Sequence, residues 1–253
     1  MPLELVTVPC LSDNYAFLLH NAETGETALV DAPEADPIEA ALADRGWTLT
    51  DILITHHHYD HTDAVNALRG KARVIGAKAD THRLPDLNVA VAEGDALQVL
   101  GEDVHIFDVS GHTIGHIAFY FPESGIAFTA DSLMAMGCGR LFEGSAPQMW
   151  ESLLKLRALP ADTIIASGHE YTASNAKFAA SLGEDNPALS QRITEITKAR
   201  AAGEATVPSL LSVECATNPF LRADDPALKS AVGLPHATDA EVFAEIRRRK
   251  DNF

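Results

Sequence analysis

The chain has 253 residues, with 36 Asp and Glu against 19 Lys and Arg, which gives a formal net charge of −17. A chain this acidic repels nucleic acid and anionic membrane surfaces unless a local basic patch intervenes. Hydrophobic residues make up 46% of the sequence, enough for a large core and too many for a disordered chain. We therefore expect a globular protein with neither a nucleic-acid nor a membrane partner.

The sequence shows neither a targeting signal nor the cysteine spacing of a disulfide framework. The first ten residues, MPLELVTVPC, lack the basic segment and apolar core of a signal peptide. No apolar run approaches the roughly 18 residues that span a bilayer. The cysteines Cys10, Cys138 and Cys215 are few and widely spaced, which indicates reduced thiols. The expected location is the cytoplasm.

Up to about residue 170 the sequence predicts a mixed, sheet-containing domain. Short apolar runs bounded by turn residues predict strands at residues 3–8, 15–19, 27–30, 51–55, 104–109, 117–121, 126–130 and 163–166. Helical spacing of apolar side chains predicts helices at residues 36–45, 64–68 and 147–159.

The character of the sequence changes near Tyr171, after which it is mainly helical. Helices are expected at residues 173–182, 188–201 and 239–250, with breaks at residues 206–208 and 218–220. We therefore expect two domains: a catalytic domain over residues 1–171 and a small helical domain over residues 172–253.

Residues 54–61, ITHHHYDH, place four histidines and an aspartate directly after an expected strand. If the chain stays extended there, His56 and His58 point to one side and His57 points away. Asp60 and His61 follow where the chain turns into a helix, so they aim at a neighbouring point. The spacing favours two adjacent metal sites over one.

Three further strands each deliver a histidine or an aspartate into a loop. His112 and His116 lie in the loop after residue 109, Asp131 ends the strand at residues 126–130, and His169 follows the strand at residues 163–166. Imidazole with carboxylate suits zinc, iron or manganese. A lone histidine at a strand end is usually structural, and a structural zinc site would favour cysteine, but four such strand ends together favour a metal centre.

The motifs THHHYDH, GHTIGH, TADS and GHEYT together resemble the metallo-β-lactamase superfamily. The resemblance implies an α+β fold, an αββα sandwich with a dinuclear metal site at one edge, followed here by a C-terminal α-helical domain. It implies His56, His58 and His112 on the first metal, Asp60, His61 and His169 on the second, and Asp131 as the bridge. His57 and His116 have no ligand role in this scheme, and His116 is expected to be structural.

A second set of motifs, GCGRLFEG, GHEYT, NPFLR and RRRKDNF, is similar to the glyoxalase II (hydroxyacylglutathione hydrolase) family over essentially the whole chain. That resemblance implies hydrolysis of S-D-lactoylglutathione, or another S-2-hydroxyacylglutathione, to glutathione and a 2-hydroxy acid, in methylglyoxal detoxification. It implies two divalent ions per chain, zinc first, with iron or manganese also suited. We expect a monomer.

Two metals about 3.5–4 Å apart lower the pKa of a bridging water to roughly 7, and the resulting hydroxide attacks the thioester carbonyl. No side-chain nucleophile is then required, although Cys138 lies near the expected site. Asp131 and Asp60 are the expected catalytic carboxylates; Asp60 could also accept a proton, but its role as a metal ligand is the simpler choice.

The resemblance places the glutathione moiety on Arg140, Phe142, Tyr171, Arg247 and Lys250. Without it, residues 247–250 would be assigned to a solvated last helical turn, where cations complement the helix dipole. Many relatives have Tyr at the position of Phe142, and often Lys at that of Arg140, so we expect either a weaker affinity for glutathione or a different acyl-thiol preference, with the catalytic prediction unaffected.

Other functions share parts of this pattern. A sulfur dioxygenase acting on glutathione persulfide uses a single iron, whereas the full second-metal set and the helical tail favour hydrolysis. Lactonases share the core, as do β-lactamases, which are secreted. A nuclease would carry a basic surface, which −17 opposes. A metal-binding protein without catalysis is a different class, and only turnover excludes it.

Overall fold

The computed structural model describes residues 3–253, and contacts between Cα atoms divide the chain into two compact units. The first unit runs to Val109 and includes Ile114–Ala130, and the second consists of Ser110–Thr113 and Asp131–Phe253. The loop segment that carries His112 therefore belongs to the second unit, although the strands on both sides of it belong to the first.

The first unit contains a six-stranded sheet whose strands follow the order of the chain. They are β1 (Glu4–Cys10), β2 (Asn14–His20), β3 (Thr27–Val30), β4 (Leu49–Leu53), β5 (Arg73–Ala77) and β6 (Val89–Val91). The pairs β1–β2 and β2–β3 are antiparallel, and the pairs from β3 to β6 are parallel. Every residue of β2 and β3 is buried, as in a strand covered on both faces.

A second, antiparallel group of strands faces this sheet within the first unit. It consists of β7 (Leu97–Val99), β8 (Glu102–Asp108), β9 (Ile117–Phe121) and β10 (Ile126–Ala130). The ring of Phe17 on β2 lies 5.6 Å from that of Phe128 on β10, and Phe121 on β9 lies 5.8 Å from Phe128. These rings form the core between the two layers of strands.

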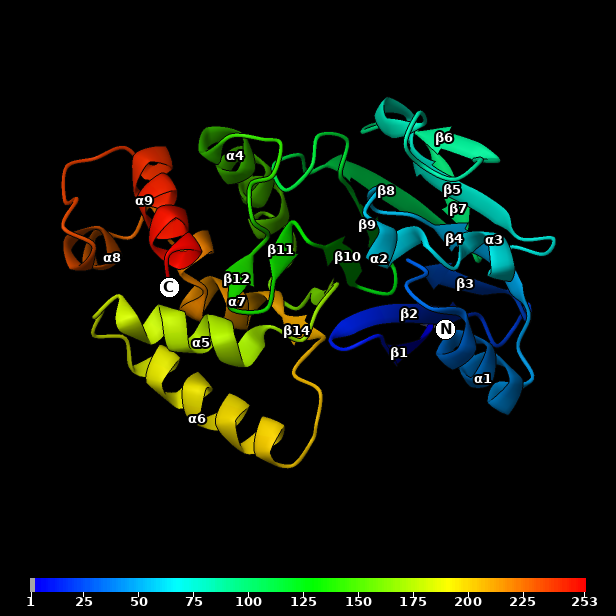
Figure 1. Ribbon diagram of the computed structural model, residues 1–253, viewed down its shortest axis with the longest axis horizontal. Coiled ribbons are helices and arrows are strands. Elements are labelled where there is room, and N and C mark those ends of the chain that lie inside the picture. The colour runs from blue at the N-terminus through cyan, green and yellow to red at the C-terminus, as the bar shows by residue number, and fades with distance from the viewer. Residues whose placement is uncertain (1–2) are drawn as a thin grey trace. The chain divides into compact units, whose positions relative to one another are not determined.

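Short helices connect the parallel strands of the first sheet. They are α1 (Ala35–Arg45), α2 (Tyr59–Thr62), α3 (Val65–Leu68) and the 3-10 helix η1 (Lys78–Asp80). Figure 1 shows α1 and α3 beside the strands of this sheet. Ile38 and Leu42, spaced four residues apart on α1, are buried, so one face of the helix closes that side of the sheet.

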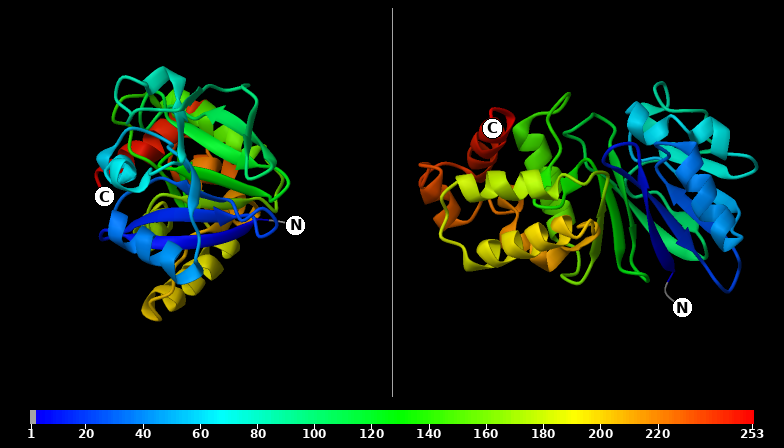
Figure 2. Two further views of the ribbon diagram at one scale, coloured as in Figure 1. Left: turned by 90° about the vertical axis from the view of Figure 1, so that its right-hand side faces the viewer. Right: turned by 60° about the horizontal axis from the view of Figure 1, so that its bottom comes forward.

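The second unit is mainly helical. Its strands are β11 (Leu133–Met134), β12 (Gly137–Cys138), β13 (Ile164–Ser167) and β14 (Ser209–Leu210). Its helices are α4 (Ala146–Arg157), α5 (Thr172–Ser181), α6 (Pro187–Ala201), α7 (Leu211–Thr217), η2 (Pro219–Leu221), α8 (Pro226–Ala231) and α9 (Asp239–Asp251). Figures 1 and 2 show α5 and α6 side by side, and β11 and β12 form an antiparallel hairpin.

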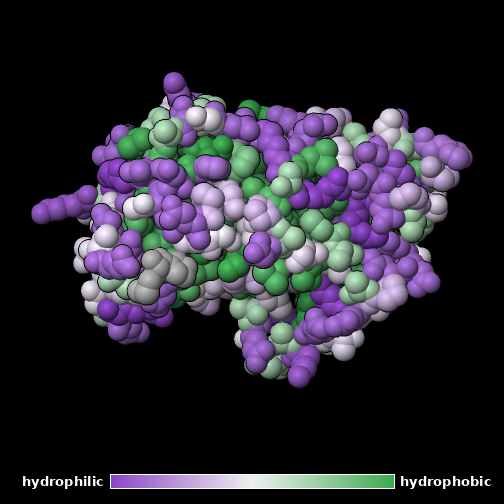
Figure 3. Space-filling model, turned by 180° about the vertical axis from the view of Figure 1, so that it is seen from behind, coloured by the Kyte–Doolittle hydropathy of each residue, from purple (hydrophilic) through white to green (hydrophobic). Residues whose placement is uncertain are grey.

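Within residues 3–253, no helix is both long and apolar enough to cross a membrane. The face of the molecule in Figure 3 carries hydrophilic residues over much of its area, with smaller apolar patches between them.

Candidate metal centre and substrate-binding residues

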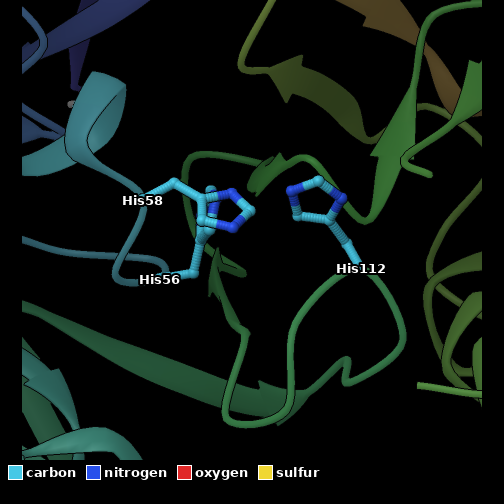
Figure 4. A group of neighbouring side chains, drawn as sticks. All are labelled: His56, His58 and His112. Atoms are coloured by element: carbon cyan, nitrogen blue, oxygen red, sulfur yellow. The ribbon is translucent and has the colours of Figure 1, made fainter. Parts of the chain in front are cut away.

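The segment after β4 separates its three consecutive histidines. His56 Nε2 lies 3.1 Å from His58 Nδ1, and Figure 4 shows both side chains on this segment. His57 instead places Nδ1 3.0 Å from Oδ2 of Asp80, at the end of η1. The alternation expected from an extended chain is confirmed, because His56 and His58 share a side and His57 has a different partner.

Helix α2 carries the next two candidate ligands, Asp60 and His61. His61 is fully buried, and its Nε2 lies 4.0 Å from Asp60 Oδ2. The amide of Asn14, at the start of β2, donates to the backbone carbonyl of Asp60 at 3.0 Å and to its carboxylate at 3.2 Å. The first turn of α2 is thereby fixed to the first sheet.

Asp31 orients this half of the site, and we did not predict its role. Its Oδ2 lies 2.8 Å from His61 Nδ1 and accepts from the Thr55 hydroxyl at 2.9 Å, while its Oδ1 accepts from the Thr55 backbone N–H at 2.9 Å. A carboxylate on Nδ1 fixes the ring and its tautomer, which turns Nε2 toward the opposite side. The available signal was a carboxylate directly after the apolar strand β3, the same pattern that identified Asp131.

His116 packs on the segment that carries His56, and the candidate ligand groups found among residues 3–253 do not include it. Its ring stacks on that of His56, with centroids 4.5 Å apart and an interplanar angle of 13°. Its Nδ1 lies 3.2 Å from the carbonyl of Ile117. This packing agrees with the structural role expected for His116.

The second unit brings His112, Asp131 and His169 together. Nε2 of His112 and Nε2 of His169 each lie 3.4 Å from the same atom, Asp131 Oδ2. Two donors about 2.1 Å from one tetrahedral ion would lie about 3.4 Å apart, so either histidine could hold an ion together with Asp131. The Nδ1 of His112 lies 2.8 Å from the carbonyl of Arg140, which orients this ring in turn. Figure 4 shows His112 on its loop.

Among the described residues, three groups of His and Asp side chains could hold a metal ion: His56, His58 and His112; His56, His61 and Asp131; and Asp60, His61 and His169. The first and third are the sets that the family resemblance implies for two metals. Imidazole nitrogens with carboxylate oxygens are suitable donors for zinc, iron or manganese. The donor set therefore fits a metal centre.

Gly139 approaches this part of the site so closely that no side chain fits. A Cβ there would lie 2.0 Å from the carbonyl oxygen of Asp131 and 2.9 Å from Nδ1 of His112. The chain can therefore pass directly against two candidate ligands only with glycine at this position.

Three of the five expected substrate-binding residues are exposed beside the candidate ligands of the second unit. The ring of Tyr171 stacks on that of His169, with centroids 4.6 Å apart. Phe142 is 61% exposed and meets the ring of His112 edge-on at 5.2 Å. Arg140 is exposed as well, with its Nε 3.6 Å from Asp251 Oδ1.

Arg247 is buried, unlike a cation of a solvated helical turn. Its Nη1 donates to the carbonyl of Cys138 at 3.0 Å, and its Nη2 pairs with Asp251 at 2.7 Å. Lys250, three residues along α9, lies 5.4 Å from the ring centroid of Phe178. Burial is the main cause that lowers the pKa of Lys250, and Arg247 adds repulsion. The other two cations of this turn, Arg248 and Arg249, both pair with Glu245.

Cys138 is poorly suited to act as a nucleophile. Its side chain is buried, and burial raises the pKa of the thiol to about 11 although Arg247 pulls it down. The thiolate is the reactive form of cysteine, and with this raised pKa little thiolate exists at neutral pH.

Family comparisons agree with this arrangement. Residues 13–169 match the model of the metallo-β-lactamase superfamily, and residues 170–253 match the hydroxyacylglutathione hydrolase C-terminus. A protein from Cereibacter sphaeroides (strain ATCC 17025) named hydroxyacylglutathione hydrolase is 66% identical, with full coverage of both chains. The chain belongs to the hydroxyacylglutathione hydrolase family. A relative of the same name from Ruegeria pomeroyi is 62% identical, again with full coverage of both chains.

Solved structures support the fold of this hydroxyacylglutathione hydrolase family member. The BLEG-1 B3 metallo-β-lactamase superposes with a TM-score of 0.67 at 21% identity, covering 86% of this chain and 99% of its own. ETHE1 from Myxococcus xanthus gives 0.66 at 24% identity, covering 98% and 90%. The α+β sandwich with a C-terminal helical region is confirmed, and family membership implies a hydrolase with two divalent metals.

Proposed function

We propose that this chain hydrolyses the thioester of S-2-hydroxyacylglutathiones, with S-D-lactoylglutathione as the first expected substrate. The products are glutathione and a 2-hydroxy acid, D-lactate in that case, as in methylglyoxal detoxification. The observation that carries the proposal is a complete set of seven candidate ligands in a chain 66% identical over its whole length to a protein of that name.

The ligand assignment is part of this proposal. His56, His58 and His112 would hold one ion, and Asp60, His61 and His169 the other, with Asp131 shared between them. Two bound divalent ions lower the pKa of a water to about 7 and polarise the thioester carbonyl. Zinc is the first expectation, with iron or manganese as alternatives.

Side-chain and backbone groups outside the ligand set keep the candidate ligands in position. Asp31 fixes the ring of His61, and the Arg140 carbonyl fixes the ring of His112. Asn14 holds Asp60, whose carboxylate could accept a proton from the attacking water. Such fixed partners reduce the rearrangement that the site needs during reaction.

Recognition of the glutathione moiety would fall to Arg140, Phe142, Tyr171, Arg247 and Lys250. Arg140 and Lys250 supply cations for the glutathione carboxylates in a chain of net charge −17. The buried Arg247 would act indirectly. It would hold the carbonyl of Cys138, two residues before Arg140, and so position the loop that carries Arg140. Phe142 offers an exposed ring without a hydroxyl, so it cannot donate a hydrogen bond there.

The proposal includes residues 1–171 as the catalytic domain, residues 172–253 as the glutathione-binding domain, a monomer and a cytoplasmic location. The cysteines within residues 3–253 form no disulfide, which suits a reducing compartment. Turnover of S-D-lactoylglutathione by the purified protein tests the proposal. Loss of turnover with a chelator and recovery with added zinc would support it, and no turnover of the metal-loaded protein would contradict it.

A further inference from the structure

The hairpin of β11 and β12 is held by side chains from the helices that follow it. Nδ2 of Asn218 donates to the carbonyls of Met134 and Gly137, at 3.1 and 3.0 Å. The backbone N–H of Met136 donates to Oε2 of Glu214 at 2.8 Å. One amide and one carboxylate thus bind both strands and the turn of the hairpin.

Two more side chains continue this pattern along the same backbone. Nδ2 of Asn175, on α5, donates to the carbonyl of Ala135 at 3.1 Å, and Arg247 donates to that of Cys138. Each residue from 134 to 138 therefore has a backbone group bonded to a side chain of the helical region. Hydrogen bonds of this kind in a buried setting are expensive to break, because the group left behind loses its partner away from water.

The anchoring side chains are themselves buried and matched in charge. Asn218 and Glu214 are inaccessible to solvent, and Oε2 of Glu214 also accepts from Nδ2 of Asn218 at 3.1 Å. Arg192 and Ser209 bind the other oxygen of Glu214. A buried carboxylate needs such a charged partner, so the cluster forms one connected network.

The turn of the hairpin is inserted into the helical core. Met136 has φ of +60°, a left-handed conformation that is unfavourable for a residue with a side chain. Its side chain packs in one buried cluster with Ala176, Ala179, Leu189 and Ile196. Packing and hydrogen bonds together therefore hold the turn in a conformation that the local sequence does not favour.

The opposite end of this segment touches the candidate metal ligands. Directly after β12, Gly139 lies against His112 and the Asp131 backbone. The next residue, Arg140, provides the carbonyl that lies 2.8 Å from His112 Nδ1. A shift of the hairpin would therefore move the group that orients His112.

We propose that Asn218 and Glu214 are positioning residues for the metal centre, acting through the hairpin on His112. The helical region would then have a second task besides substrate binding, because its buried network sets the geometry of a metal ligand. This inference rests on the proposed role of His112 as a ligand, but it does not depend on which thioester is the substrate.

The variant Asn218→Asp tests this role. The new side chain can still accept from the Phe220 N–H, as Asn218 does at 3.0 Å. Its second oxygen, however, would face two carbonyls and the carboxylate of Glu214. We expect a displaced hairpin, an affinity for zinc about ten- to hundred-fold lower in competition with a chromogenic chelator, and an altered Co(II) absorption spectrum.

Asn186→Asp is the matched control, because Asn186 is also an Asn cap in the helical region. It accepts from the Leu189 N–H and donates to the Ala216 carbonyl, and neither partner belongs to the hairpin. We expect this variant to keep the zinc affinity and the Co(II) spectrum of the parent, even where its thermal stability falls. The contrast separates positioning from a general loss of stability.

Zinc affinity and the Co(II) spectrum are read without substrate, so they test positioning even if the parent does not hydrolyse S-D-lactoylglutathione. A folded Asn218→Asp variant with parental zinc affinity and Co(II) spectrum would overturn the proposal. If that variant does not fold, Asn218→Ala is measured in the same way, with the same expected direction. Failure of both to fold would show that Asn218 serves the fold as such, and would also overturn it.

Discussion

His57 Nδ1 lies 3.0 Å from Oδ2 of the buried Asp80, whereas His56 Nε2 lies 3.1 Å from His58 Nδ1. His57→Ala should therefore keep the metal content and leave activity within a few-fold of the parent. His58→Ala should lose metal and most of the rate, because a candidate ligand is removed. Metal analysis and kinetics on both variants would contradict the assignment if the two behaved alike.

Asp31→Asn should weaken metal binding about ten- to hundred-fold, because the neutral amide no longer fixes His61 as a carboxylate does. Asp51→Asn is the matched control, since Asp51 is a buried carboxylate of the same sheet whose partner is Arg73. Zinc competition titrations on both variants measure the difference. Equal losses of affinity would mean that removing any buried carboxylate from this sheet damages the site.

Lys250→Met should raise KM several-fold and change kcat little, because this cation would bind the part of the substrate that does not react. Arg248→Met is the control, since Arg248 is exposed on the same helix and pairs with Glu245. Steady-state kinetics with S-D-lactoylglutathione give both constants. An unchanged KM in Lys250→Met would remove Lys250 from the binding residues.

The same lysine predicts a pH effect on binding. Burial lowers the pKa of Lys250 from its ordinary 10.5, so its charge is lost at a lower pH than that of a solvated lysine. KM should therefore begin to rise with increasing pH before an ordinary lysine would titrate. The pH profile of KM in Lys250→Met should lack this rise, and a rise of equal size there would assign it to another group.

Cys138→Ser should retain activity within a few-fold. With the pKa of the thiol raised to about 11, about one molecule in ten thousand carries the thiolate at pH 7. Alkylation of Cys138 by iodoacetamide at pH 7 should accordingly be slow in the folded protein. If the variant kept its metals but lost turnover, Cys138 would have to take part in the reaction.

Much of the fold could be predicted because its central strands are apolar runs bounded by turns. The strands β3, β9 and β10 begin and end at the predicted residues. By contrast, β6 and β7 have three residues each, too few to show alternation, and we did not predict them. The hairpin of β11 and β12 was missed because buried side chains distant in sequence determine its conformation.

The candidate site divides in the same way. Spacing alone separated His57 from His56 and His58, because alternation is a local property of an extended chain. The position of Asp31 directly after β3 marked it as a candidate, but its partnership with His61 joins residues 30 positions apart, so the local pattern does not reveal which ligand it orients. Four adjacent cations favoured a solvated helical turn, but Arg247 is buried and donates to the carbonyl of Cys138, which is 109 positions away.

The central claim is a thioesterase with two metals, and one measurement tests it most directly. S-D-lactoylglutathione hydrolysis by the purified protein is assayed with metal content determined on the same sample. The account predicts turnover that a chelator abolishes, with about two divalent metals per chain. Absence of turnover with two metals bound would contradict the proposed substrate. Persulfide oxidation and lactone hydrolysis would then be assayed. Turnover that persists after both metals are removed would contradict the mechanism.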